Sequence, residues 1–193
     1  MNKNEVFKIE LSYIKNEEYR NSAEALLELA PDYFYEVPAA STGKYHPEFA
    51  QGERGLIRHT KVALKIAKDI LDLEYTNSIF TDNEKDLMLI AIMFHDCQKL
   101  GNPKEKYTRF DHPILAANFI KENQDKTSLK DDEIDLITRT IKSHMGQWNT
   151  NMYSDITMSK PNDKYECFVH TCDYLSSKKY LNVKFDNNDN III

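Results

Sequence analysis

The amino-acid sequence predicts an all-α domain that ends in a small β-hairpin. Apolar residues recur at the spacing of a helix face through most of the 193 residues. One stretch, residues 87–94, is apolar throughout, which is typical of a helix buried on all sides. A strand pattern occurs only near the end, where residues 181–185 and 190–193 flank a run of turn-forming residues.

The first helical region is expected over residues 3–29, where Leu11, Ile14, Ala23 and Leu26 recur at roughly helical spacing. Pro31 ends this pattern. Residues 33–55 contain two prolines, three glycines and several aromatic residues without a clear period. Because long irregular segments inside a compact domain tend to be functional, this segment is a candidate part of a binding site.

Five further helices are expected over residues 55–73, 83–96, 112–123, 130–144 and 163–178. The second of these follows Asp82, which we assign as its N-cap, and Pro113 suits the first turn of the third. A polar loop over residues 145–162 contains the only tryptophan, Trp148. We therefore divide the chain into a helical extension packed on the core (1–35), a main domain (36–181) and a hairpin segment (182–193).

Composition limits the possible functions. The formal net charge is −6 and the basic residues are scattered, which argues against an extended nucleic-acid footprint but is compatible with a small anionic substrate. No apolar run reaches the roughly 18 to 20 residues that span a bilayer, and the N-terminus has no apolar signal core. The three cysteines have no disulfide-framework spacing, so we expect a cytoplasmic protein.

Ligand-type side chains stand at the ends or inner faces of the apolar helices. His95 and Asp96 end the apolar run, and buried charges are normally paired or bound to a metal. The others are His59, His112, His144 and Asp173. Each has an ordinary interpretation, as a hydrogen-bonded core histidine or an aspartate at the solvated edge of a helix, but their joint occurrence favours a metal site. Imidazole with carboxylate suits Mn, Fe, Co, Ni or Zn, and the cysteine spacing argues against a structural zinc site.

The order of these residues resembles the HD-domain superfamily of metal-dependent phosphohydrolases. His59 in Gly-Leu-x-x-His-Thr matches the first histidine of that family, His95-Asp96 in His-Asp-x-x-Lys-x-Gly matches the doublet, and Asp173 matches the last aspartate. The resemblance covers residues 36–181, and it implies the helical bundle of an HD domain there.

Within the superfamily, the chain is most similar to the HD domain attached to a bacterial 3′→5′ exoribonuclease. In that enzyme too, a Pro-Ala-Ala stretch and a histidine precede the first ligand, as residues 38–40 and His46 do here. That enzyme has an upstream OB-fold for RNA, and it often has two consecutive histidines where this chain has His144-Met145. We therefore do not infer an RNA substrate for this chain from that resemblance.

The resemblance also implies a ligand set and a mechanism. One metal would be held by His59, His95, Asp96 and Asp173, and a second by His112 and His144 with Asp96 as the bridge. Two such ions roughly 3.5 to 4 Å apart activate a water molecule and neutralise phosphoryl oxygens. Asp96 and Lys99 would then be the catalytic residues, with a small phosphorylated substrate, a nucleotide, as the partner.

Several other residues are candidates for substrate contact. Lys99 would meet a phosphate oxygen, and His46 would contact the substrate or protonate its leaving group; the alternatives are a solvated lysine and a surface histidine. Arg58 and Lys178 are further phosphate candidates, unless they are only surface charges. His170 is expected to support the site structurally. Tyr45, Phe49 and Trp148 could stack on a base, although we favour core packing for aromatic residues.

Three functions remain open at this stage. The leading one is hydrolysis of a nucleotide, cyclic nucleotide or short oligonucleotide phosphate ester by a metal-activated water. The second is a di-iron HD-domain oxygenase, because a few relatives with the same ligands belong to that class. The third is a non-catalytic nucleotide-binding regulatory module, although the complete ligand set argues against it.

Overall fold

The computed structural model describes residues 2–41 and 46–192, and the regular secondary structure in these ranges is helical, as predicted. Tyr45 lies outside the described residues. Eight α-helices follow one another along the chain: α1 (Lys3–Val6), α2 (Lys8–Leu11), α3 (Glu17–Leu29), α4 (Gly55–Leu71), α5 (Asp82–Phe94), α6 (His112–Glu122), α7 (Asp131–Ser143) and α8 (Lys164–Ser176). The 3₁₀ turns are η1 (Asp32–Tyr35), η2 (Glu48–Ala50), η3 (Glu74–Ser78) and η4 (Gln124–Lys126).

Helix α5 is the centre of the molecule. From Lys85 to its end every residue is buried, and the helix packs against α3, α4, α7 and α8. Because no side of α5 faces water, its sequence is apolar on all faces rather than on one stripe. It begins with a capping box in which Thr81 is the N-cap and Glu84 bonds back to the Thr81 backbone. The assignment of Asp82 as the N-cap was wrong by one residue.

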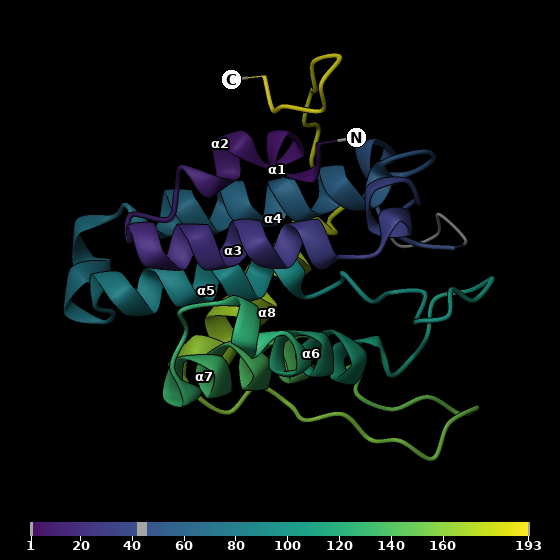
Figure 1. Ribbon diagram of the computed structural model, residues 1–193. Helices are drawn as coiled ribbons and strands as arrows, with labels where there is room; N and C mark the ends of the chain where they lie inside the picture. Colours follow the sequence, from purple (N-terminus) through teal and green to yellow (C-terminus); the bar gives the residue numbers. More distant parts are fainter. Residues whose placement is uncertain (1, 42–45, 193) are drawn as a thin grey trace.

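The other helices are arranged around α5 in three groups. Helices α4 and α8 pack against each other on one side, while α6 pairs with α7 on another. The N-terminal helices α1 to α3 lie beside α4 and α5 (Figure 1), and Phe7, Ile14 and Leu26 belong to the same buried cluster as α5. The division at residues 36 and 181 stays a prediction. In the described part of the chain, every helix is too short or too polar to cross a membrane.

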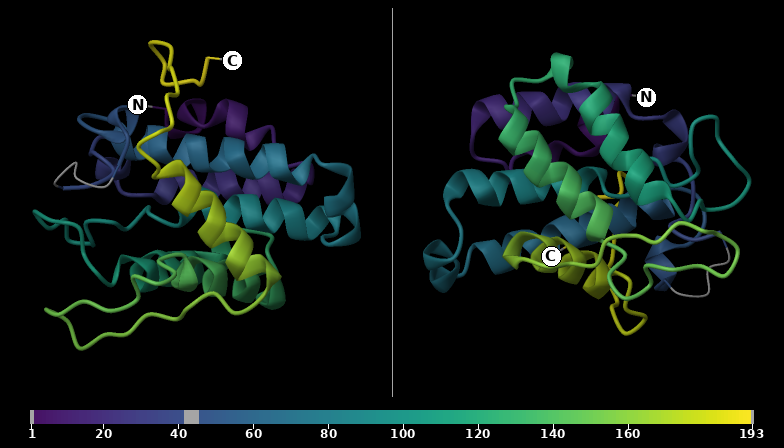
Figure 2. Two further views of the ribbon diagram at one scale, coloured as in Figure 1. Left: turned by 180° about the vertical axis from the view of Figure 1, so that it is seen from behind. Right: turned by 90° about the horizontal axis from the view of Figure 1, so that it is seen from below.

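Loops gather at one end of the bundle. The described residues before α4 and the segments between α5 and α6 and between α7 and α8 project to the same side in all three views (Figures 1 and 2). The first two are linked by Ser41, whose Oγ lies 3.0 Å from Oγ1 of Thr108 and accepts a hydrogen bond from the Thr108 backbone N–H. Since α5 and α7 both end here, the polar residues that follow them are brought together.

Two details of the sequence prediction need correction. The N-terminal region is not one helix, because residues 12–16 interrupt it and Asn16 caps α3 through its side chain. The predicted C-terminal β-hairpin is absent from the described residues, where Phe185 and Ile191 form only an isolated antiparallel bridge. In this turn the Asp186 side chain accepts hydrogen bonds from the backbone N–H groups of Asn188 and Asn190. Two short strands without a third are marginal by themselves.

Candidate metal centre

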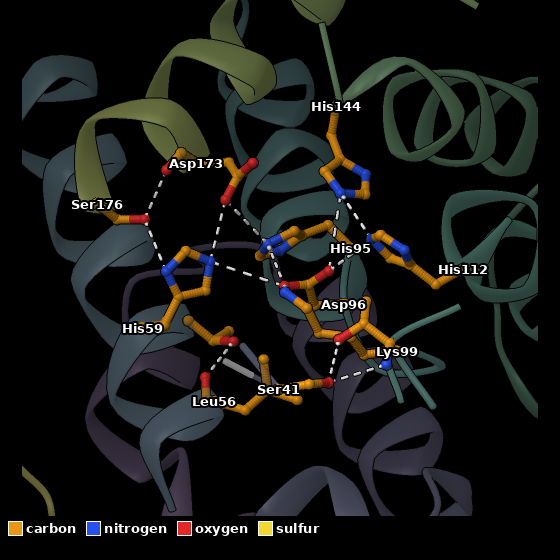
Figure 3. Close-up of polar contacts among 12 residues, drawn as sticks. Ser41, Leu56, His59, His95, Asp96, Lys99, His112, His144, Asp173 and Ser176 are labelled. Atoms are coloured by element: carbon orange, nitrogen blue, oxygen red, sulfur yellow. Dashed lines mark hydrogen bonds and ion pairs between the residues drawn. The ribbon is translucent and has the colours of Figure 1, made fainter. Parts of the chain in front are cut away.

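Six predicted ligands come together at the loop-bearing end of the bundle. Each ligand lies on or next to one of five helices. These are His59 on α4, His95 and Asp96 directly after α5, His112 at the start of α6, His144 just after α7, and Asp173 on α8. Figure 3 shows their side chains pointing toward one another. All are buried except Asp173, whose side chain is 21% exposed. The centre therefore reaches solvent on the side of Asp173.

Asp173 and the first two histidines form one half of the centre. The His59 Nε2 atom lies 3.0 Å from the nearer Asp173 oxygen, and His95 Nε2 lies 3.4 Å from the same oxygen. The three ligand atoms all lie within 4.8 Å of one another. This spacing is compatible with one shared ion.

Asp96 connects this half to the other two histidines. Its Oδ2 atom faces the first half, at 3.8 Å from His59 Nε2 and 3.4 Å from His95 Nε2. Its Oδ1 atom lies 3.0 Å from His112 Nε2 and 3.7 Å from His144 Nε2. The two oxygens of one carboxylate thus point to different pairs of imidazoles, as a carboxylate does when it bridges two ions.

The backbone determines the orientation of three of the imidazoles. The Nδ1 atoms of His95, His112 and His144 each lie 2.6 to 2.7 Å from the carbonyl oxygen of the residue three positions earlier. His95 and His144 are the C-caps of α5 and α7, where carbonyl groups of the last turn lack partners within the helix. Each Nδ1–H therefore donates to a carbonyl, and each Nε2 points into the centre.

The orientation of the His59 imidazole is determined by a hydroxyl group instead of a backbone carbonyl. Its Nδ1 lies 3.1 Å from Ser176 Oγ, and that hydroxyl donates its own proton to the Asp173 carbonyl oxygen at 2.7 Å. The Ser176 oxygen is consequently an acceptor for the Nδ1–H of His59. Ser176 was missed at the sequence level because a serine near a helix end carries no distinctive signal.

The network leaves lone pairs facing one another. A neutral imidazole that donates through Nδ1 has only a lone pair at Nε2, yet His112 Nε2 and His144 Nε2 are 3.3 Å apart and both face Asp96. Within the part of the chain that the structure describes, His59 Nε2 and Asp96 Oδ1 are buried without a hydrogen-bond partner. Such an arrangement needs a cation, and the negative ends of the α5 and α7 dipoles also favour one. These residues therefore fit a divalent metal.

The charges of the centre agree with this interpretation. Burial would raise the pKa of Asp96, but Lys99 and His95 hold it well below its usual value. Burial likewise opposes ionisation of Asp173, whose pKa is held well below its usual value by His59 and His95. Burial lowers the pKa of His95, but Asp96 and Asp173 outweigh it and raise the pKa to about 10. At neutral pH, His95 thus holds a proton on Nε2 that a metal would displace.

Burial keeps two other histidines neutral. It lowers the pKa of His144 to about 3, with a further contribution from the neighbouring positive charge of His95. Burial also lowers the pKa of His59, against the opposite effect of the neighbouring Asp173 carboxylate. Neutral imidazole is the form that binds metals, so both side chains have the required protonation state.

Lys99 and His46 lie at the edge of the centre. The Lys99 ammonium group contacts Asp96 Oδ2 directly and is almost fully buried. The His46 ring packs edge-on against His59, with 5.0 Å between the ring centroids, and its Nδ1 is buried without a hydrogen-bond partner among the described residues. Burial lowers the pKa of His46 to about 3. A neutral His46 is better suited to contact a substrate than to donate a proton as an imidazolium.

Two of the other candidates support structure near the centre. Arg58 donates to the backbone carbonyls of residues 49, 51 and 53 and pairs with Asp189, so it holds the loop before α4 rather than a phosphate. The Nδ1–H of His170 donates to the His144 carbonyl at 2.6 Å. Gly146 adopts a left-handed φ of +60° against this ring, and a Cβ there would come within 2.1 Å of it.

The aromatic candidates divide into two environments. Phe49 packs against the core and against Phe185, in agreement with the packing interpretation. Trp148 is 50% exposed and stacks on Tyr174, with Lys178 over the other ring. For Trp148 the expectation of core packing is wrong, because the loop that carries it extends away from the helices.

Comparison with known proteins identifies relatives of this chain. The family model of the HD domain matches residues 56–178. The chain is 28% identical over 147 residues to the 3′-5′ exoribonuclease YhaM of Listeria welshimeri, covering 71% of this chain and 44% of that protein. YhaM of Listeria monocytogenes and of Listeria innocua are each 26% identical with the same coverage. The chain thus spans less than half the length of these relatives. No solved structure matches it significantly.

Proposed function

The chain belongs to the HD-domain family of metal-dependent phosphohydrolases, and we propose that it hydrolyses a phosphate ester of a nucleotide, cyclic nucleotide or short oligonucleotide. The observation that carries the proposal is the convergence of four imidazole Nε2 atoms on the carboxylates of Asp96 and Asp173. Asp96 lies between the two pairs of imidazoles. The ester class is supported by the relatives named 3′-5′ exoribonuclease, although this chain corresponds to less than half of each.

The proposed ligands form two sets that share Asp96. His59, His95 and Asp173 would hold one divalent ion with Asp96 Oδ2, and His112 and His144 would hold a second with Asp96 Oδ1. A bound divalent metal lowers the pKa of water and neutralises phosphoryl oxygens. Because His95 would bind through Nε2, which carries a proton in the absence of metal, loading of the centre would release that proton to solvent. Mn, Fe, Co, Ni and Zn all suit this ligand set.

The remaining residues would bind and orient the substrate. Lys99 forms an ion pair with Asp96. If a metal ion neutralised Asp96 instead, the Lys99 ammonium group would be available for a phosphate oxygen. Neutral His46 packs against His59 and would contact the ester from the loop before α4. A small substrate would enter on the side of Asp173, whose side chain is partly exposed to solvent. A small anionic substrate is also the kind that the scattered basic residues of the sequence favour.

The test is a hydrolysis screen with purified protein supplemented with Mn²⁺. Nucleotides, cyclic nucleotides, dinucleotides and short RNA are offered, and release of phosphate or nucleoside is measured. Asp96→Ala removes the shared ligand and should abolish the activity. Asp69→Ala is the matched control, because Asp69 is an exposed carboxylate on α4 that forms an ion pair with Lys65. Activity that survives in Asp96→Ala would contradict the proposal.

Two other results would replace this function with another. An iron-loaded protein that consumes oxygen and hydrolyses none of these esters would be an oxygenase, so metal content and oxygen uptake are measured on the same preparation. Nucleotide binding without turnover for any metal would indicate a regulatory module.

A further inference from the structure

A stack of three side chains stands beside the metal centre. The Lys178 ammonium group lies 3.1 Å from the centroid of the Tyr174 ring, and Trp148 stacks on Tyr174 with 5.7 Å between ring centroids and 23° between ring planes. Trp148 is 50% exposed and Tyr174 36%. Lys178 and Trp148 contact Tyr174, so the indole of Trp148 is the ring of this stack that remains most open to solvent.

The stack is connected to the ligands through short covalent and hydrogen-bonded links. Tyr174 follows Asp173, the ligand whose side chain is exposed to solvent. Trp148 lies in the loop that begins at His144, and the His144 carbonyl is held by His170 on the same helix as Tyr174. The Tyr174 ring lies 6.0 Å from the His170 ring between centroids, one helical turn earlier on α8, so the stack is within one turn of α8 from the ligand Asp173.

We propose that Trp148 and Tyr174 form a stacking platform for the base of a substrate whose phosphate is at the metal centre. The inference rests on the proposed function and narrows it to phosphate esters that carry a nucleobase. An aromatic ring accepts any base on its face, and Lys178 strengthens the stack through a cation–π contact. Two rings are too small a surface for a stable protein partner, whose interface would bury about 800 Å² on each side.

The platform differs from the other aromatic contacts of the molecule. Phe7 stacks on Phe34, and Tyr35 meets Phe34 edge-on, but all three are fully buried and belong to the core. Core packing does not explain the position of Trp148, because its indole is half exposed to water. Stacking alone does not read the edge of a base, so the platform favours base-carrying esters without selecting one base.

The experiment uses Trp148 as its own probe, since it is the only tryptophan. The Mn²⁺-loaded protein is titrated with a nucleoside 5′-phosphonate, whose carbon–phosphorus bond resists hydrolysis, and with the matching ribose 5-phosphonate that lacks the base. Free N-acetyltryptophanamide is titrated in parallel to correct for absorption by the base. We expect the nucleoside compound to quench the Trp148 emission and the ribose compound to leave it nearly unchanged.

Calorimetry on variants measures the contribution of the platform. Trp148→Ala should reduce the ratio of affinities for the two phosphonates by roughly 5- to 150-fold, the range expected from base–aromatic stacking, and Trp148→Phe should retain part of it. Tyr75→Ala is the control, because Tyr75 is an exposed aromatic residue in η3, at the opposite end of α4 from His59. It should leave the ratio as it is.

The outcomes separate this inference from the proposed function. Binding of both phosphonates with equal quenching or none overturns the platform while the phosphate site stands. Base-dependent quenching in a protein that hydrolyses no phosphate ester supports the platform and contradicts the hydrolase. Absence of binding for both compounds contradicts both proposals.

Discussion

Helix α4 carries two buried ionisable side chains, His59 and Lys61, that differ in how their surroundings satisfy them. Lys61 is fully buried, lies 3.5 Å from Glu10 Oε2, and donates to Asn190 Oδ1 at 3.0 Å. Its charge meets an opposite charge. His59 instead directs a lone pair toward the oxygens of Asp96 and Asp173.

The difference separates a structural role from a ligand role. A buried ion pair needs no metal, because each charge faces an opposite one, and here it ties α2 and the C-terminal turn to α4. A cluster of imidazole lone pairs and carboxylates is incomplete unless a proton or a metal joins them. Burial of a polar residue is therefore a weak sign of function, whereas a buried lone pair that points at carboxylate oxygens is a much stronger one.

The largest effect is expected when the shared carboxylate loses its charge. Asp96→Asn keeps the shape of the side chain but removes the bridge, so we expect kcat/KM for any phosphate ester to fall by at least about 10³-fold. Elemental analysis should show loss of bound metal in the same variant. If Asp96→Asn retains both its metal and its activity, the ligand role that distinguishes His59 from Lys61 is contradicted.

The reverse result is expected at the ion pair. Lys61→Met leaves the Glu10 carboxylate buried without a partner, which should reduce the free energy of unfolding by about 3 kcal/mol while the metal content stays unchanged. The double variant Glu10→Leu/Lys61→Met should recover most of this loss, because two apolar side chains replace the pair. Chemical denaturation of the metal-loaded proteins measures both. Loss of metal in Lys61→Met would show that the two regions are coupled.

Removal of metal should destabilise the wild-type protein. A ligand present at 100 times its dissociation constant stabilises the folded state by about 2.7 kcal/mol, which corresponds to roughly 5 to 10 °C in Tm for a chain of this size. Thermal unfolding with Mn²⁺ and with a chelator gives the difference. Asp96→Asn should show little response, and a full response in that variant would place the ion elsewhere.

The smallest effect concerns pH. His95 has a raised pKa of about 10, so the metal-free protein keeps that proton from neutral pH up to about pH 10, and metal binding must release it. Affinity for metal should therefore rise about tenfold per pH unit across this range. His59 and His144 release none there, because burial lowers the pKa of each. Calorimetry between pH 7 and about 8.5, in buffers of different ionisation enthalpy, counts the protons. Release of none would contradict the assignment of the His95 proton.

The sequence by itself determined the helices and the identity of the candidate ligands. Helical periodicity is a property of neighbouring residues, and a His-Asp pair at the end of an apolar run requires compensation wherever the run is buried. The histidines at 95 and 144 also contained the signal for their anchoring, because a residue just past a helix end lies near the free carbonyls of the last turn. Their role as metal ligands remains a prediction, although the structure brings all six candidates together.

Only the tertiary structure decided how these residues relate to one another. The division of the Asp96 oxygens between two pairs of histidines depends on how α4, α6, α7 and α8 pack around α5. The same packing places Ser176 against His59 and Trp148 against Tyr174, residues far apart in the sequence. It also replaced the expected hairpin by a turn whose Asp189 contacts Arg58. The physical reason is that local spacing specifies which face of a helix is apolar, whereas the distance between side chains on different helices depends on the whole core.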